Sequence, residues 1–463
     1  MKLWRTGTAP MTPEAPSASW PRLARLPFFY GWVVVAVAFV TMAIGVNTRT
    51  AFSLLFPPIV VEFGWDRATT AGAFSLGFLA SAFYTPFIGT AMDRFGPRLV
   101  IPFGVLLVCA GLILTTFAAQ PWHFYLSLGV LVVGGSVFIS YVGHSLILPH
   151  WFVRRRGLAT GIAFSGVGVG AILLLPWLQS LIGASGWRAA CWALAGLLLV
   201  VVLPLNLVLQ RQRPADLGLA PDGAPGGAAA AAQPGGEDNV VDRRWAATEW
   251  TLALAIRQTR FWWLFAAFFS GLFAWYGVLV HQTQYLTEIG FSAELAAWAL
   301  GLVGLAGIAG QIVIGHLSDR IGREWAWTIA ALGFVGCYLC LLALEGRPSA
   351  LLLYLMVVAQ GLLGYGLATV YGAIPAELFQ GKHFGSIFGT LSSASILGAA
   401  SGPWLMGALY DRLGSYAPGF WLASVISLAS IGCVWLAAPR KVRVVAGQVA
   451  RLQASRLATK RAG

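Results

Sequence analysis

The feature that most limits how this chain can fold is a series of apolar runs of about 20 residues or more, each long enough to cross a hydrocarbon core of ~30 Å as a helix. Of the 463 residues, 58% are hydrophobic and only 10% are charged, whereas a soluble domain carries about a quarter charged residues. A membrane β-barrel is excluded, because its strands would alternate polar and apolar residues over stretches of about 10. The runs predict an all-α membrane protein with twelve transmembrane helices, at residues 28–52, 68–92, 98–118, 123–148, 157–182, 187–209, 260–284, 293–316, 326–345, 349–374, 384–408 and 418–438.

The formal net charge of +13 could suggest nucleic acid as a partner, but the distribution of the charge argues against it. If the N-terminus is cytoplasmic, all but five of the 30 Lys and Arg fall in the tails, the central loop or the cytoplasmic loops. This is the positive-inside bias of membrane proteins. We therefore expect an integral protein of a bacterial inner (plasma) membrane, with both termini cytoplasmic and with the lipid bilayer, not nucleic acid, as its surroundings. The five exceptions are Arg49, Arg67, Arg188, Arg347 and Arg412.

A polar, low-complexity segment rich in Pro, Gly and Ala divides the apolar runs six and six. Such a composition predicts a flexible linker. Its last part, "EWTLALAIRQTR", is a candidate for a short helix on the cytoplasmic surface, and the basic C-terminal tail for a segment that rests on anionic lipid. The expected organisation is a cytoplasmic tail at 1–27, a six-helix bundle at 28–210, a cytoplasmic linker at 211–258, a second six-helix bundle at 259–438 and a basic cytoplasmic tail at 439–463.

The two groups of six runs share a sequence pattern. "GTAMDRFGPR" at Gly89–Arg98 recurs as "GHLSDRIGRE" at Gly315–Glu324. "EFGW" at Glu62 recurs with the same offset as "EIGF" at Glu288. A register kept within about two residues over ~125 positions indicates duplication. Further matches are Gly157 with Gly385, Gly161 with Gly389, and Gly170 with Gly398.

Two six-helix repeats with G-x-x-x-D-R-x-G after the second and eighth helices resemble the major facilitator superfamily, whose substrate site lies between the repeats. Within it, several stretches are similar to the monocarboxylate transporter and oxalate/formate exchanger group. These stretches are "FFYGWVVV", "EFGWDRATTAGAFSL", "WFVRRRGLATGIAFSGVGVG" and "LYDRLGSY".

The resemblance implies a gate on the cytoplasmic side. In this superfamily the loop aspartate lies against the start of a helix in the other half, where backbone N–H groups are unpaired and the helix dipole is positive. Asp93 would then face the helix start near Phe384, and Asp319 the one near Gly157, with neighbouring arginines able to pair with Asp319. The simpler alternative is that the basic residues only anchor the chain to the cytoplasmic side. The candidate gating residues are Asp93, Arg94, Arg98, Arg154, Arg155, Arg156, Asp319, Arg320 and Arg323.

Arg49 is the candidate that most directly suggests a substrate, because a charge inside the membrane marks a functional site by default. It lies in the outer half of the first predicted helix, and a guanidinium can bind both oxygens of a carboxylate. The resemblance associates a basic residue at about this place with substrate. The alternative is an arginine that extends to the outer interface.

The other polar side chains within the spans are candidates for substrate contacts or for helix–helix hydrogen bonds. His144 and His281 stand out, because histidine titrates near neutral pH and could carry a coupling proton. The group's Asp and Arg on the eighth helix are replaced here by Gly307 and Gln311, and 384–408 holds no Lys or Arg. A two-arginine dicarboxylate site is therefore not expected. The full set is Tyr141, His144, Tyr276, His281, Gln282, Gln311, Gln360, Tyr365 and Tyr371.

We thus expect a secondary active transporter that moves a small organic anion, a monocarboxylate, by alternating access, acting as a monomer. The alternative within the same fold is an exporter of a neutral or amphiphilic small molecule. An enzyme or receptor is disfavoured, because no P-loop, metal-ligand cluster or nucleophilic triad is present at a plausible spacing. No metal or cofactor is expected. The five cysteines, including the Cys337-x-x-Cys340 pair, lie in predicted helices and read as packing residues.

Overall fold

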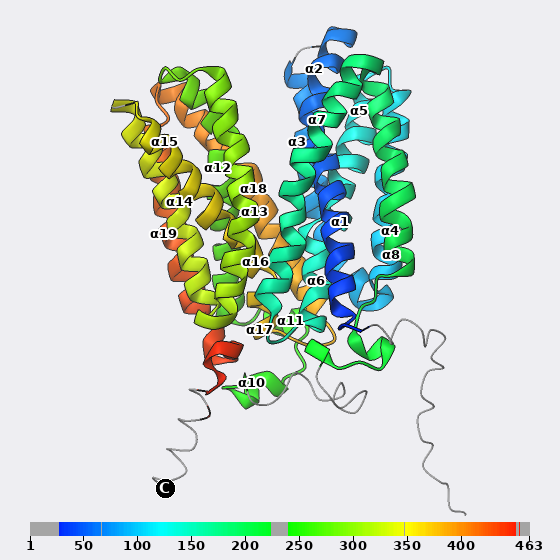
Figure 1. The fold of residues 1–463 in the computed structure, drawn as a ribbon, viewed down its shortest axis with the longest axis vertical. Helices are drawn as coiled ribbons and strands as arrows, with labels where there is room; N and C mark the ends of the chain where they lie inside the picture. The colour runs from blue at the N-terminus through cyan, green and yellow to red at the C-terminus, as the bar shows by residue number, and fades with distance from the viewer. Residues whose placement is uncertain (1–26, 66, 224–238, 347, 451–452, 454–463) are drawn as a thin grey trace, which may run out of the picture.

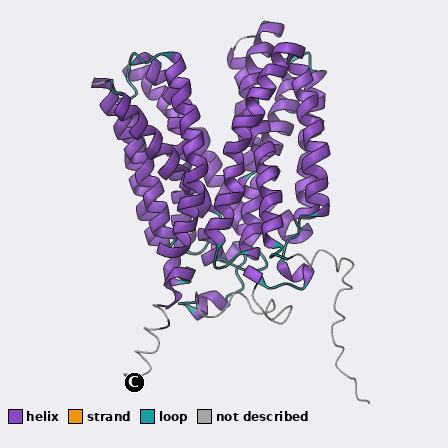
Figure 2. Ribbon diagram, in the orientation of Figure 1, coloured by secondary structure: helices purple, strands orange, loops and turns teal. Residues whose placement is uncertain are grey.

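The computed structural model describes residues 27–65, 67–223, 239–346, 348–450 and 453, and this part of the chain is almost entirely helical (Figure 2). Its only β-type pairing among the described residues is one bridge between Val240 and Arg443. Except at their ends, helices satisfy their backbone hydrogen bonds internally, which is what a chain in a hydrocarbon solvent requires.

The N-terminal bundle contains six spans. The first four are α1 Gly31–Thr50 with α2 Phe52–Phe63; α3 Arg67–Phe95; α4 Pro97–Thr116; and α5 Pro121–Phe124 with η2 Tyr125–Gly134, η3 Gly135–Ile139 and α6 Tyr141–Trp151. The fifth and sixth are formed together by α7 Arg156–Leu197 with η4 Leu198–Val202 and α8 Leu203–Val208.

The C-terminal bundle repeats this order. Its spans are α12 Thr259–Glu288; α13 Ala293–Ile321; α14 Arg323–Gly346; α15 Ala350–Val357 with η8 Val358–Leu363, η9 Gly364–Gly366, α16 Leu367–Tyr371 and α17 Ala373–Leu378; α18 Phe384–Leu413; and α19 Ala417–Ala437.

The predicted count of twelve spans agrees with the structure. Eleven described segments are long and apolar enough to cross a membrane, and one of them, Arg156–Val208, has 53 residues. Since about 20 residues suffice for one crossing, this segment is long enough for two. The chain changes direction inside α7 at Gly186, whose φ of 82° is not helical, and this separates the fifth span from the sixth.

The predicted end of the first span at residue 52 is wrong. The helix continues through Pro57 and Pro58 to Phe63, where Gly64 ends it in a left-handed conformation with φ 64°. This helix, Gly31–Phe63, has 33 residues, more than the roughly 20 that one crossing needs.

The two bundles stand side by side; their ribbons meet at one face and diverge toward the other (Figure 1). We call the face where they meet the latch face; it also carries the described ends of the chain. Contacts between bundles run mainly along two helix pairs, α3 with α18 and α7 with α13.

These two pairs approach through glycine. A Cβ added to Gly89 would collide with the backbone of Gly385, and one added to Gly157 would collide with the carbonyl oxygen of Gly315. Small residues allow helix backbones to come this close in a membrane. Farther from the latch face, an added Cβ on Gly301 would meet no atom within 4 Å.

The fourth and tenth spans share an irregularity. Each passes from a π-helical stretch, η2 or η8, into a 3₁₀ stretch, η3 or η9, before continuing as α-helix. Such departures inside a long helix often occur at functional sites. Tyr141 begins α6 directly after the first break, and Tyr365 lies inside η9.

Both ends of the predicted linker are packed against the bundles. Residues 211–223 include η5 Pro214–Leu217 and η6 Pro221–Gly223; residues 239–258 include α10 Arg243–Ala247 and α11 Leu252–Ala255. The expected flexible character is therefore wrong for these two stretches, and 224–238 lie outside the described residues. The predicted surface helix is reduced to α11. The tail, expected on lipid, forms η10 Pro439–Lys441 and η11 Ala446–Gln448, and its end lies outside the described residues.

Candidate substrate site and gate

Arg49 lies between the two bundles. Its Nη2 atom donates a hydrogen bond of 3.0 Å to the hydroxyl oxygen of Tyr276 on α12, and its guanidinium carbon lies 5.4 Å from the ring centroid of Phe78 on α3. The side chain is half-buried. It therefore connects an N-terminal helix to a C-terminal one and points toward the space between them, not toward lipid headgroups.

Three tyrosines gather around this arginine. Tyr141 of the fourth span interacts electrostatically with Arg49, with Tyr276 of α12 and with Tyr365 of the tenth span. All three are half-buried. Trp275 stacks on Tyr365 with ring centroids 4.3 Å apart. One cation, three hydroxyls and aromatic faces thus share a small volume, an arrangement suited to a carboxylate on an apolar body.

Gly307 lies directly against this cluster. A Cβ added there would collide with Cδ2 of Tyr365, so an aromatic ring covers this position. The glycine is therefore what allows Tyr365 to stack on Trp275.

Replacing Gly307 by alanine is expected to displace Tyr365 and to lower uptake about tenfold, mainly through a higher KM, since overpacking of this kind costs about 1–3 kcal/mol. Initial rates in proteoliposomes over a range of substrate concentrations measure this. Gly304→Ala on the same helix is the matched control, because an added Cβ there meets no atom within 4 Å. Equal effects of the two substitutions would contradict the assignment.

The remaining polar candidates do not join the cluster. His281 binds the carbonyl oxygen of Pro403 at 2.9 Å and packs on Tyr416, which keeps it between α12 and α18. Gln360 is fully buried and accepts from the thiol of Cys337. His144 is fully buried one turn beyond Tyr141; its Nδ1 lies 3.0 Å from the Ser140 carbonyl oxygen, and its Nε2 has no hydrogen-bond partner among the described residues.

Gln311 faces the other bundle. The backbone of Gln311 lies against Gly161 of α7, and its amide oxygen is buried without a hydrogen-bond partner among the described residues. It belongs to the seam between α7 and α13.

The two motif aspartates make the contacts expected of them. Asp93 accepts hydrogen bonds from the backbone N–H groups of Gly385 (2.8 Å) and Ser386 (2.9 Å) at the start of α18. Asp319 accepts from Gly157 (2.9 Å) and Leu158 (3.0 Å) at the start of α7. A carboxylate here satisfies two unpaired helix N–H groups and meets the positive end of the dipole. We call these two contacts the latches.

The expected pairing of Asp319 with Arg154, Arg155 or Arg156 is wrong. Asp319 pairs with Arg323 of its own bundle at 2.8 Å. Arg156 pairs across the seam with Glu377 of α17 at 3.0 Å, both side chains at most 4% exposed. Arg154 and Arg155 are exposed, because the loop turns them to the outside while Arg156 begins α7.

Glu377, which the sequence did not single out as a gating residue, lies at the centre of this ion-pair network. It accepts from Arg156, lies 3.5 Å from Arg323 Nε, and its backbone oxygen accepts from Arg443 at 2.8 Å. Burial holds the pKa of the Arg443 guanidinium below its usual range, an effect that the nearby Glu377 carboxylate only partly offsets. The available signal was a lone carboxylate closing an apolar run, in "IPAELF".

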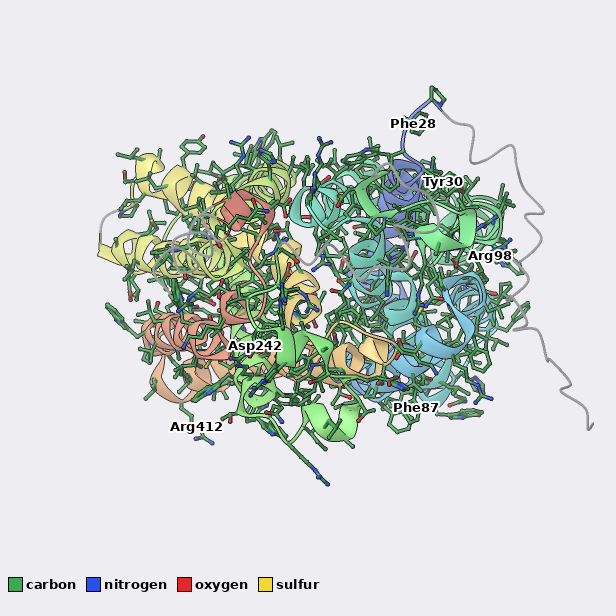
Figure 3. All side chains as sticks on the ribbon, turned by 90° about the horizontal axis from the view of Figure 1, so that it is seen from below. Phe28, Tyr30, Phe87, Arg98, Asp242 and Arg412 are labelled. Atoms are coloured by element: carbon green, nitrogen blue, oxygen red, sulfur yellow. The ribbon has the colours of Figure 1, made fainter. Side chains whose placement is uncertain are left out.

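Three other candidate gating arginines lie outside the latches. Arg98 donates two hydrogen bonds to the carbonyl oxygen of Leu207 and lies at the rim of the N-terminal bundle when the latch face is viewed directly (Figure 3). Arg94 lies over the ring of Phe95, and Arg320 is exposed. Their contacts fit the anchoring alternative better than a gate.

The sequence model of the Major Facilitator Superfamily matches residues 33–370 and 286–461. The chain belongs to this superfamily. It is accordingly an integral membrane transporter and not an enzyme.

Curated relatives carry transporter names. The chain is 29% identical to monocarboxylate transporter 13 of Bos taurus over 410 residues, covering 87% of this chain and 88% of that protein. It is 29% identical to monocarboxylate transporter 12 of Homo sapiens over 427 residues, covering 85% and 77%.

Solved structures match the fold. The proton:xylose symporter XylE superposes with a TM-score of 0.68 at 14% identity, covering 91% of this chain and 99% of that one. The human organic anion transporter MFSD10 gives 0.65 at 17% identity, covering 87% and 99%. FucP in the outward conformation gives 0.65 at 15% identity, covering 90% and 100%.

Proposed function

We propose that this transporter is a secondary active carrier that moves a small organic anion, a monocarboxylate, by alternating access. The observation that carries the proposal is Arg49, a half-buried guanidinium in the first span that is hydrogen-bonded to Tyr276 of the other bundle. A substrate carboxylate bound there would contact both bundles at once. Binding energy used in this way can shift the balance between the two bundle arrangements.

The surroundings of Arg49 favour one carboxylate per substrate. No second cation joins the arginine within the described cluster, whereas the tyrosine hydroxyls and the rings of Phe78 and Trp275 suit a short apolar body. The names of the curated relatives, monocarboxylate transporters 12 and 13, support the same substrate class.

The latch face is proposed to be the cytoplasmic face. The described ends of the chain and the ordered linker segments lie there, and most Lys and Arg residues belong to these parts of the sequence. With both latches made at that face, the structure corresponds to an outward-facing state. The named relatives come from cattle and human, and a bacterial inner membrane stays a prediction.

Proton coupling is proposed to use the substrate's own carboxyl group or His144. No Asp or Glu of the described residues lies in the middle of a span, and His281 is engaged by Pro403. One chain supplies both halves of the site, so a monomer is sufficient for transport.

Uptake into proteoliposomes tests the proposal. The purified protein is expected to accumulate a labelled lactate- or acetate-type monocarboxylate, with the uptake of one competed by others and not by dicarboxylates; an imposed pH gradient tests coupling. Absence of uptake and competition across a panel of carboxylates, together with transport of neutral amphiphilic compounds, would replace the proposal by the exporter alternative.

A further inference from the structure

Two short segments on the latch face, one after each bundle, make corresponding contacts. The first strap, residues 209–223, follows α8; the second strap, residues 439–448, follows α19. Neither strap is part of the repeated motif, and the polar contacts described for them lie at the latch face, away from the proposed substrate cluster. Both lie beside the same two regions of the repeat, the D-R-x-G turn and the end of the fourth or tenth span.

The first shared position is the glycine of the D-R-x-G turn. In the first strap, Gln212 donates from Nε2 to the carbonyl oxygen of Met92 at 3.1 Å, and its Oε1 lies 3.1 Å from where a Cβ on Gly96 would be. In the second strap, Gln448 donates from Nε2 to the carbonyl oxygen of Ile321 at 2.8 Å. The same Nε2 atom lies 3.3 Å from where a Cβ on Gly322 would be.

Both glutamines act on the end of the helix that carries a latch aspartate. The Met92 carbonyl, which immediately precedes Asp93, also accepts from Gly96 N at 3.1 Å, so two donors fix that peptide. The Ile321 carbonyl belongs to the last turn of α13, where carbonyls have no partner within the helix. In each bundle a glutamine amide thus donates to a carbonyl in the last turn of the helix that carries the latch aspartate, although the two acceptors differ, since Met92 corresponds to Ser318 in the repeat and not to Ile321.

The second shared position is the end of the fourth or tenth span. Trp151, which ends α6, donates from Nε1 to the carbonyl oxygen of Arg211 at 3.1 Å. Arg443 donates to the carbonyl oxygen of Glu377 at 2.8 Å. Trp151 and Glu377 have the same separation in the sequence as Gly96 and Gly322. Each strap therefore ties equivalent parts of its bundle together.

We propose that Gln212 and Gln448 are positioning residues that hold the two D-R-x-G turns in the conformation from which Asp93 and Asp319 form the latches. The straps stabilise the state closed to the cytoplasm, because the orientation of each aspartate matters only while its latch is made. Arg213, next to Gln212, adds an electrostatic attraction to Asp93. This inference rests on the alternating-access part of the proposed function and not on the substrate.

The test measures how often the cytoplasmic face opens. Ala376 is 2% exposed and lines a small cavity in the seam together with Arg156 and Phe384, so Ala376→Cys reports opening through its rate of alkylation by a membrane-impermeant maleimide from the cytoplasmic side. The partly exposed Cys340 and Cys433 are replaced by alanine beforehand. No substrate is needed.

Gln212→Met and Gln448→Met keep the side-chain length and lose the amide. Each is expected to raise the alkylation rate about fivefold, the shift that corresponds to one net hydrogen bond, and the double variant more. Gln258→Met is the control, since the side chain of Gln258 makes no capping hydrogen bond at the start of α12. If a methionine variant does not fold, Gln212→Glu or Gln448→Glu, which also removes the amide donor, is tested by the same alkylation measurement.

A double-mutant cycle separates positioning from a general structural role. If Gln212 acts through Asp93, Gln212→Met adds nothing to the alkylation rate in an Asp93→Asn background. Unchanged alkylation in the folded single variants, or full additivity with Asp93→Asn, overturns the proposal. The alkylation results do not depend on whether carboxylates are transported. Carboxylate uptake is therefore a separate test of the proposed function, and a failure of uptake does not change the alkylation result.

Discussion

Replacing Arg49 by glutamine is expected to lower carboxylate uptake about a hundredfold or more while the protein still reaches the membrane. Glutamine keeps a donor near Tyr276 but removes the charge, so the substrate carboxylate would be desolvated without a counter-ion; removing one partner of such a buried pair costs about 2–5 kcal/mol. The measurement is kcat/KM for uptake in proteoliposomes, with the amount of inserted protein determined separately.

Two further variants show what the arginine contributes. Arg49→Lys keeps the charge but loses the fork that binds two oxygens, so an intermediate loss is expected. Tyr276→Phe removes the hydroxyl that accepts from Arg49 and is expected to cost about tenfold, in line with one hydrogen bond to a charged group. Uptake by the glutamine variant at the level of the unmodified protein would eliminate Arg49 as the substrate residue.

Replacing Glu377 by glutamine is expected to be the most destabilising single change at the latch face. Among the described residues, Arg156 loses its only carboxylate partner, and Arg323 retains only Asp319. Breaking a buried ion pair from one side costs about 3–5 kcal/mol, because a charge is left uncompensated. Thermal unfolding of the purified protein and the Ala376→Cys alkylation rate both report this loss.

Glu62→Gln is the matched control for Glu377. Glu62 also pairs with an arginine, Arg188, at 2.7 Å, but these side chains are 39% and 43% exposed. An exposed pair contributes at most about 1 kcal/mol, so the control variant should unfold close to the temperature of the unmodified protein. Similar losses of thermal stability for the two substitutions would show that the buried Glu377 network is no more stabilising than an exposed ion pair.

The spans could be predicted from sequence because each depends on local information, whereas the latch contacts were expected only from the resemblance to the major facilitator superfamily. Length and hydropathy define a membrane helix without knowledge of its neighbours, and the duplicated D-R-x-G motif marks two helix ends at once. The end of the first span was missed because apolar residues continue past Pro57 and Pro58 to Phe63. A hydropathy pattern does not show that prolines are tolerated inside that helix.

The side-chain partners were harder to predict. Arg154, Arg155 and Arg156 form a uniform basic run, and only the direction in which α7 begins decides which of them is buried against Glu377. The clustering of the three tyrosines near Arg49 depends on how the fourth, seventh and tenth spans converge. The strap glutamines are farther apart in the sequence than the two copies of the motif and so fall outside the register of the repeat. This hides their common role from a search for spacing.

The glycine contacts at Gly89 with Gly385 and Gly157 with Gly315 have a consequence for the speed of transport. Where backbone touches backbone, no side chains interlock, so the bundles can separate there without rotamer changes and with little apolar surface transferred. The closed arrangement is then held mainly by a few polar contacts, whose effects on the equilibrium range from about fivefold for one net hydrogen bond to about a hundredfold or more for the buried Arg156–Glu377 pair. Turnover in such a carrier can be tuned in small steps by single polar substitutions far from the substrate, while the helices themselves stay unchanged.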